Sequence, residues 1–204
     1  MLGLPKATEV NRRVAKEKLY SNASLTPALR DMIKEQVGVV VWRNKLAAGT
    51  FNVSAGETVS ELQIFEIELR QHELDKRVMQ AVAKAIPYKI LFLLTFGGEA
   101  QVWLEAAGTF YNTDWRSLSE IALKFEGLNL DAVYENLARQ IAEGRLGVSG
   151  DIAEAVEADK QRQRLDRDIA TLEKKVLREK QFNKQVALNA ELKRLREELE
   201  DTNL

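Results

Sequence analysis

The chain has 204 residues, 45% of them apolar and 30% charged, which is enough for one core domain and an additional segment. The formal net charge of −1 excludes a global basic field for nucleic acid. The absence of cysteine excludes disulfides, thiolate metal sites and cysteine nucleophiles, and the single histidine, His72, excludes sites built from several histidines.

The N-terminal sequence and the apolar runs indicate a cytoplasmic protein. Residues 1–13 lack a basic region followed by an apolar core, so we expect no signal peptide. The longest apolar run, IPYKILFLLTF, is too short to span a bilayer and contains Lys89. We therefore expect no membrane contact.

A basic segment near the start of the chain is a candidate contact for nucleic acid. The sequence NRRVAKEK contains one glutamate and four cations, namely Arg12, Arg13, Lys16 and Lys18. Such a cluster can bind phosphates. A solvated helix face explains the same charges, and we favour it, so nucleic-acid binding stays the alternative here.

The first half of the chain alternates helix and strand signals. Thr26 or Ser24 followed by Pro27 predicts a helix that begins there and runs through SLTPALRDMIKEQ. The β-branched run VGVVVWR predicts a buried strand directly after it. A short strand with Phe51 and Val53 and then the alternating segment 61–71, ELQIFEIELRQ, are the next expected strands.

The following segment repeats the alternation. Apolar residues at helical spacing predict a helix over 73–86, which Pro87 ends. YKILFLLTF is the most apolar strand, and the Gly97–Gly98 pair predicts a hairpin that leads into EAQVWLEAAG. TFYNTDW adds a further candidate strand. Asn129 as N-cap and Gly144 as stop predict an amphipathic helix between them.

These elements predict an α+β domain, with a mixed sheet of about five strands and flanking helices. We expect the domain to cover residues 1–145. The glycines of GRLGVSG then mark a linker over 146–152, and a long charged helix of coiled-coil type is expected over 153–204.

The C-terminal segment differs from the rest in composition. From Asp151 to the end it holds 13 acidic and 12 basic residues and no glycine, proline or tryptophan. Two apolar stripes follow a four-three-four spacing, the pattern of helices that pack side by side. The stripes consist of Leu165, Ile169, Leu172 and Val176, and of Leu188, Leu192, Leu195 and Leu199.

The two stripes are out of register with each other. Leu165 and Leu188 are 23 residues apart, so on a straight helix the stripes point about 140° apart. Either one continuous helix contacts different surfaces with its two halves, or the helix breaks near REKQFNKQ and folds back as a hairpin. We favour the continuous helix because no glycine or proline marks a break.

The sequence resembles a family of bacterial proteins catalogued as a domain of unknown function. The resemblance rests on MLGLPKATEVNRRV, WRNKLAAGTFNV, IFEIELR, IPYKILFLLTF, TDW, LNLDAVYENLARQI and LEKKVLREKQFNKQVALNAELKRL. Genes of this family often lie beside DNA methyltransferase and helicase genes. The resemblance therefore implies a setting in restriction or phage-defence clusters, and it implies no catalytic residue.

Two glutamates on one strand raise the question of an active site. In LQIFEIELR, Glu66, Glu68 and Arg70 share one face. The element order also resembles the core of restriction-type nucleases, in which a metal-binding acid precedes a Glu-any-Lys motif. Here Glu68 replaces the lysine, and the preceding strand offers Asn52 instead of an aspartate. We favour a structural role in which the glutamates pair with Arg70 or a neighbouring cation.

These observations favour a non-enzymatic interaction subunit of a bacterial DNA modification or phage-defence complex. We expect it to dock through its C-terminal helix, using the two stripes, onto a second copy or onto a helicase- or methyltransferase-type subunit. We expect no cofactor and no metal. The alternative is a degenerate or active metal-dependent nuclease-like domain, with Glu66 and Glu68 as the residues that carry it.

Overall fold

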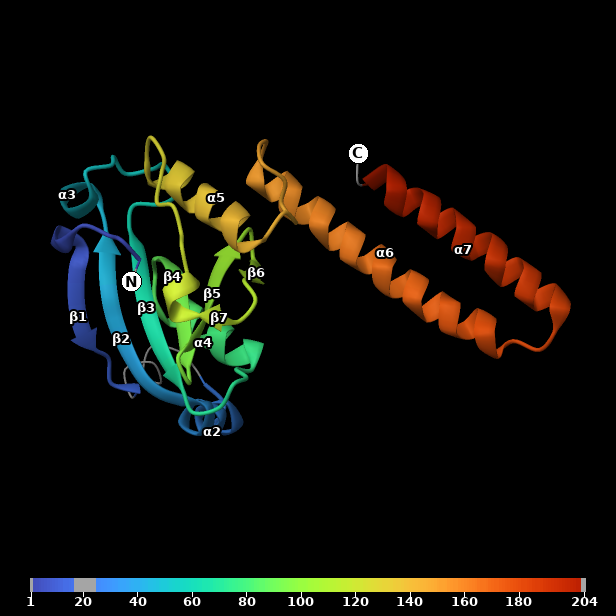
Figure 1. Cartoon of the computed structure of the whole chain (residues 1–204), viewed down its shortest axis with the longest axis horizontal. Coiled ribbons are helices and arrows are strands. Elements are labelled where there is room, and N and C mark those ends of the chain that lie inside the picture. Colours follow the sequence, from blue (N-terminus) through green and yellow to red (C-terminus); the bar gives the residue numbers. More distant parts are fainter. Residues whose placement is uncertain (1, 17–24, 203–204) are drawn as a thin grey trace. The chain divides into compact units, whose positions relative to one another are not determined.

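The computed structural model describes residues 2–16 and 25–202 of the chain. The chain divides into two compact units, Met1–Gly144 and Arg145–Leu204. The first holds the sheet and its helices, and the second holds two long helices (Figure 1). We describe each unit by itself.

The first unit alternates strands and helices along the chain, as the sequence predicts. Its elements are η1 (Lys6–Thr8), β1 (Glu9–Arg13), α2 (Pro27–Gln36), β2 (Val37–Leu46), α3 (Ala48–Phe51), β3 (Leu62–Leu69), α4 (Lys76–Ala85), β4 (Lys89–Phe96), β5 (Glu99–Ala106), β6 (Thr109–Asn112), β7 (Arg116–Ser117), η2 (Leu118–Glu120) and α5 (Leu130–Ile141).

One mixed, seven-stranded sheet organises this unit. The strands follow the order β1-β2-β3-β4-β5-β6, and β7 pairs with β5. Among the strands of the described residues, β3 and β4 pair in parallel and are connected by α4, and the other pairs are antiparallel. This architecture confirms the predicted α+β class with a mixed sheet and flanking helices.

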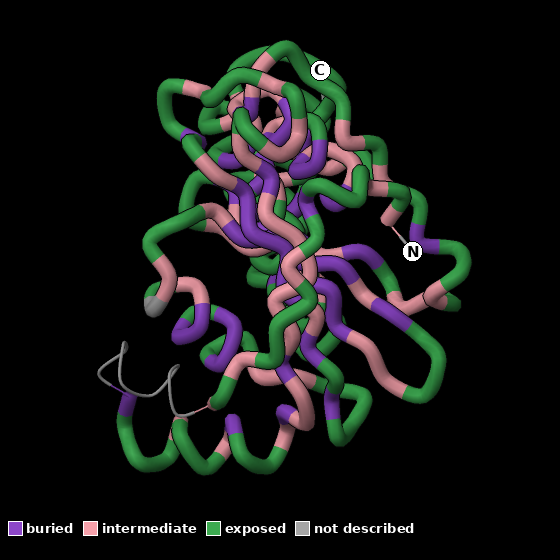
Figure 2. Tube along the Cα trace, turned by 90° about the vertical axis from the view of Figure 1, so that its left-hand side faces the viewer, coloured by how far each residue is buried: buried purple, intermediate pink, exposed green. Residues whose placement is uncertain are grey.

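Alternate side chains of the strands fill a layer on each face of the sheet, because successive residues of a strand point to opposite sides. Phe65, Phe92 and Trp103 lie on the face that α2 and α4 cover. On the other face, α5 packs against β5 and β6 through one buried side. The buried positions of the strands appear in purple in Figure 2 and the exposed loops in green.

The predicted helix ends are confirmed by their hydrogen bonds. Thr26 caps α2, since its hydroxyl accepts from the amide of Leu29 at 3.3 Å, and Pro27 occupies the first turn. The Asn129 side chain caps α5 by accepting from the amide of Ala132 at 2.9 Å. The Gly97–Gly98 turn joins β4 to β5, with φ values of 58° and 91° that suit glycine.

A single carboxylate fixes the loop that leads into β3. Asp131, in the first turn of α5, accepts from the amides of Glu57 at 2.6 Å and Val59 at 2.7 Å, and from the Thr58 hydroxyl at 2.8 Å. Partial burial would raise the pKa of Asp131, but these hydrogen bonds stabilise the charged form and lower it on balance. Gly56 passes so close that a Cβ there would overlap the carboxylate.

Two predictions about the N-terminal half are wrong. Phe51 ends the short helix α3, and neither Phe51 nor Val53 belongs to a named strand. The edge position beside β2 is instead taken by β1, which contains Arg12 and Arg13, where we expected a helix face. The residues of this exposed edge strand are mostly polar, so its sequence lacks the alternation of apolar and polar residues that would have predicted a strand.

The second unit is a pair of helices, α6 (Ile152–Arg178) and α7 (Phe182–Thr202). They lie side by side, joined at one end by a short connection (Figure 1). The preference for one continuous helix is therefore wrong, and the alternative, a break within REKQFNKQ, is confirmed. Glu179 takes an extended conformation, and its carboxylate accepts from the amide of Gln181 at 2.8 Å.

The long helix α6 begins with an N-cap in the predicted linker. The side chain of Asp151 accepts from the amides of Ala153 at 2.8 Å and Glu154 at 2.9 Å. Over residues 2–16 and 25–202, no helix combines the length and the apolar character that crossing a membrane requires.

Candidate functional site

Glu66 and Glu68 both lie on β3, and the structure places them in different environments. Glu66 is opposite Val41 of β2 and Leu93 of β4, inside the sheet, and is half-buried. Glu68 lies nearer the end of the strand, opposite Thr95, and is exposed. The two carboxylates therefore share a face, as expected, but only one of them is held by the fold.

Arg43 holds the Glu66 carboxylate with two hydrogen bonds. Its Nε donates to Oε2 at 2.7 Å and its Nη2 donates to Oε1 at 3.0 Å. Arg43 lies two residues after Val41, which is opposite Glu66, at a point where the pairing of β2 with β3 shifts register. The hydrogen bond to Glu66 raises the pKa of the guanidinium further, against the opposing effect of burial.

The predicted partner Arg70 does not take this role. Arg70 is exposed, and its backbone amide donates to the carbonyl of Gln36 at 2.9 Å. The neighbouring cation that the sequence left unnamed is Arg43. Sequence reasoning missed it because the alternation of β2 does not tell which of its residues lies opposite Glu66.

The groove beside Glu66 and the hydrogen bonds of its carboxylate bear on whether a metal ion could bind here. A groove of about 390 Å³ lies beside the pair and is lined by Leu2, Gly3, Leu4, Glu9, Asn11, Arg43, Asn44, Ile64 and Leu93. Nowhere in the described ranges do three or more His, Cys, Asp or Glu side chains gather in a way that suits a metal ion. Both oxygens of Glu66 are occupied by the guanidinium.

The comparison with restriction-type nucleases also requires a metal ligand on the strand that precedes β3. Asn52, expected on the neighbouring strand, lies in the left-handed region at φ 56° where α3 ends. The position of β2 opposite Glu66 is Val41. The structure therefore does not bring Asn52, Glu66 and Glu68 together as one ligand set.

The four basic residues of the N-terminal segment NRRVAKEK differ in their environments, as far as the structure describes them. Arg12 and Arg13 are exposed on the edge strand β1. The Lys16 ammonium donates to the carbonyl of Val37, so it is engaged by the protein. Lys18 lies outside the described residues. Phosphate binding through these residues stays a prediction.

In the second unit, the two predicted apolar stripes meet each other. Ile169 and Leu172 of α6 pack with Leu192 of α7 in one cluster, and Leu188, Leu195 and Leu199 adjoin it. Leu165 is also buried, and Val176 is half-buried. Arg196 and Glu173 tie the helices together at 2.7 Å. The stripes thus form an internal seam; whether they also contact a second protein stays a prediction.

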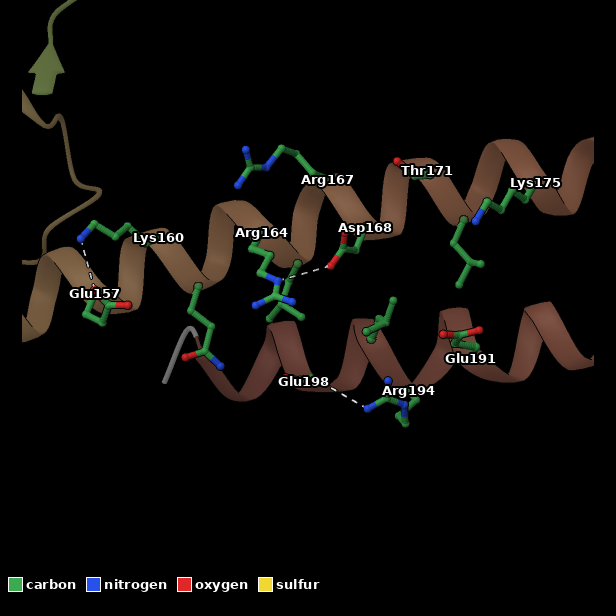
Figure 3. Close-up of a pocket in the computed structure, with 14 residues that line it drawn as sticks. Glu157, Lys160, Arg164, Arg167, Asp168, Thr171, Lys175, Glu191, Arg194 and Glu198 are labelled. Carbon is green, nitrogen blue, oxygen red and sulfur yellow. Dashed lines mark hydrogen bonds and ion pairs between the residues drawn. The ribbon is translucent and has the colours of Figure 1, made fainter. Parts of the chain in front are cut away.

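A long groove follows this seam on one side of the hairpin. Its volume is about 930 Å³, and Leu165, Leu172 and Leu195 contribute apolar side chains to its lining. Charged side chains form most of the rest, several of them paired with neighbours on the same helix (Figure 3). These pairs join Lys160 to Glu157, Arg164 to Asp168 and Arg194 to Glu198. The groove contains neither histidine nor cysteine and offers a recognition surface more than a catalytic one.

The end of the hairpin where α6 passes into α7 exposes apolar and basic side chains together. Leu177 is 85% exposed, Phe182 75% and Val186 52%. We call residues 174–184, with Val186, the hairpin tip. Sequence reasoning missed these three side chains because they do not belong to either stripe. An apolar residue outside the four-three spacing was the signal in the sequence that could have indicated an exposed apolar side chain.

Comparisons with known proteins place the chain in a family. A family described as "Domain of unknown function (DUF4391)" matches residues 2–199. Neither the curated proteins nor the solved structures contain a match. The chain therefore belongs to this family of unknown function.

Proposed function

We propose that this protein is a non-enzymatic interaction subunit that docks onto a partner protein through its C-terminal hairpin. The observation that carries the proposal is the hairpin tip, where Leu177 and Phe182 expose more than 70% of their surface. Large apolar side chains grouped at an exposed end are typical of protein contacts, because water is released when a partner covers them.

The hairpin has the form that such a role requires. The seam of Leu165, Ile169, Leu172 and Leu192 supports two helices of 27 and 21 residues, roughly 40 and 30 Å long. A rigid coiled-coil-type pair of this length presents its outer surface and tip with little loss of conformational freedom on binding.

The setting that we propose is a bacterial DNA modification or phage-defence complex in the cytoplasm, with a helicase- or methyltransferase-type subunit as the partner. This part of the proposal rests on the gene neighbourhood that the family resemblance implies. The groove and tip of the hairpin supply the contact surface. Arg12 and Arg13, which are exposed on β1, are the candidate contacts for an accompanying nucleic acid.

The alternative, a metal-dependent nuclease-like domain that uses Glu66 and Glu68, has less support. A carboxylate that receives two hydrogen bonds from Arg43 would have to release the guanidinium before it could bind a divalent metal. Glu68 alone supplies one free carboxylate, which is too few for the metal centres of such enzymes.

The test is retention of partners by the tagged protein in the bacterium that encodes it, with identification by mass spectrometry. Leu177→Ser with Phe182→Ser should abolish co-purification of a helicase- or methyltransferase-type protein. The matched control, Leu128→Ser with Tyr88→Ser, removes two exposed apolar side chains of the first unit and should retain the partner. Loss in both variants, or retention in both, would contradict docking through the tip.

A further inference from the structure

Charge is strongly separated along the hairpin. The tip segment 174–184, KKVLREKQFNK, contains five basic residues and one acidic residue. The segment 197–201 near the other end, EELED, contains four acidic residues and no basic one. The two segments therefore carry formal charges of +4 and −4, although the whole segment from Asp151 to the end is nearly neutral.

The tip cations make no ion pair with any acidic residue in the described part of the chain. In the described ranges, none of the tip's basic residues makes an ion pair, and all are exposed; they are Lys174, Lys175, Arg178, Lys180 and Lys184. Elsewhere on the hairpin, by contrast, ion pairs are frequent. The tip's charge is thus available to a second molecule.

The acidic end is only partly neutralised. Glu197 and Glu198 pair with cations one turn earlier on α7, at 3.7 and 3.5 Å. Glu200 is exposed, and neither it nor Asp201 makes an ion pair with any described residue. Free negative charge therefore remains at the end of α7.

The two charged ends cannot neutralise each other within one molecule. From Phe182 to Leu199 the helix α7 rises roughly 25 Å. The Debye length at physiological ionic strength is about 8 Å, so their mutual attraction is largely screened. A second hairpin lying in the reverse direction would bring each end within contact distance of its opposite.

The face of α7 that carries Phe182 supports this reversed arrangement. Phe182 and Glu200 are 18 residues apart, which is five turns at about 3.6 residues per turn, so they share one face at opposite ends. Val186 lies one turn from Phe182 on that face. When two such faces meet in reverse, the apolar residues of one copy lie beside the acidic end of the other.

We propose that two copies of this chain associate through their hairpins in reverse orientation, with the tip of each against residues 197–201 of the other. The arrangement is a two-fold one, in which both contacts are identical. A parallel arrangement would place the two +4 tips together, and like charges across an interface are strongly unfavourable. The long basic side chains of the tip then reach Glu200 and Asp201 of the other copy.

Pairing between copies and docking onto a partner protein use the same hairpin tip and therefore compete for it, but this inference does not rest on the proposed function. A chain that binds a partner protein through its tip need not pair with itself. A monomer that still retains its helicase- or methyltransferase-type partner would overturn the inference alone.

Sedimentation velocity of the full-length protein over a concentration series tests the pairing. We expect a monomer–dimer equilibrium at about 50 mM NaCl that weakens by about tenfold or more at about 500 mM, because exposed charges are screened. A sedimentation coefficient that stays that of a monomer over the whole series at low salt would overturn the proposal.

Charge reversal makes the test specific for tip-to-end contacts. Arg178→Glu with Lys180→Glu, and separately Glu200→Lys with Asp201→Lys, should each give monomers. The two variants mixed together should dimerise again, because each then offers the charge that the other needs. Circular dichroism checks that both keep their helices.

A matched control changes net charge equally but elsewhere. Lys6→Glu with Lys124→Glu alters two exposed cations of the first unit and should dimerise as the unchanged protein does. If the mixture of the two hairpin variants stays monomeric, the proposal is wrong. If all variants are monomeric but the tip variant alone loses binding to duplex DNA, the proposal is likewise wrong and the tip cations serve a polyanion.

Discussion

Replacing Glu66 by glutamine separates a structural role for this carboxylate from a catalytic one. Glutamine keeps the shape of the side chain and one acceptor oxygen, but removes the charge that Arg43 neutralises. Glu66 exposes 15% of its side chain and Arg43 31%. The contribution of this ion pair to stability should therefore lie between that of an exposed pair and that of a buried pair. We expect Glu66→Gln to destabilise the sheet domain by about 1–2 kcal/mol.

Urea unfolding followed by tryptophan fluorescence measures this effect in the full chain. All three tryptophans lie in the first unit, and Trp42 stacks on Phe65 with 6.3 Å between ring centres, so the signal reports on the sheet. With an m-value of about 1–3 kcal/mol/M, the midpoint should fall by roughly 0.5–1 M. Glu68→Gln is the control, and its free energy of unfolding should stay within about 0.5 kcal/mol of that of the unchanged protein.

A double-mutant cycle shows whether Arg43 is the reason. Arg43→Gln in the Glu66→Gln background should add little to the single change, with a coupling energy of about 1 kcal/mol. We also expect no cleavage of DNA or RNA in Mg²⁺ or Mn²⁺. An unshifted midpoint for Glu66→Gln, together with metal-dependent cleavage that this substitution abolishes, would refute the structural role and assign the carboxylate to an active site.

Further changes test other parts of the structure. Truncation after Gly150 should leave a soluble domain with one cooperative fluorescence transition, and aggregation would show that the hairpin belongs to the core. Leu192→Asp with Leu195→Asp should lower helical circular dichroism and partner retention without moving the fluorescence midpoint, because a charge in the seam costs several kcal/mol, about the stability of a small unit. Asp131→Ala should destabilise the sheet domain by about 1–2 kcal/mol at pH 7. Because the folded-state pKa of Asp131 is lowered, its contribution is present above about pH 4 and is lost as the pH falls through the folded pKa, so the two unfolding midpoints should converge in acid. Gly56→Ala should destabilise about as much, and combining it with Asp131→Ala should add little if both act on this loop.

Helix ends and strongly apolar strands were predictable because their signals are local. Thr26 and Asn129 cap their helices through their own side chains, and the Gly97–Gly98 turn needs only its two residues. The strand β1 was not predictable in this way. Its five residues, EVNRR, are mostly exposed and owe their strand conformation to pairing with β2, a partner more than twenty residues away in sequence.

The environment of Glu66 needed the structure for a related reason. The alternation of β3 places Glu66 and Glu68 on one face, but says nothing about which neighbour meets them. Arg43 is within reach of Glu66 because Val41, two residues before it, lies opposite Glu66, and this register is set by pairing between strands. The sequence therefore predicted that a cation would pair with this face and could not say which.

The break between α6 and α7 follows from weighing two energies. Taking the three residues after Arg178 out of the helix costs only about a few tenths of a kcal/mol each, because helix propagation is weakly favourable per residue. Bringing the stripes together buries leucines such as Leu172 and Leu192, each worth about 1.5–3 kcal/mol when fully covered. The mismatch of about 140° between the stripes prevents a straight helix from covering both on one partner, whereas a hairpin turns them toward each other. Glycine or proline would favour such a turn, but apolar burial of this size makes them unnecessary. The angular offset between the two stripes was therefore a better predictor of the break than the residue types at the break itself.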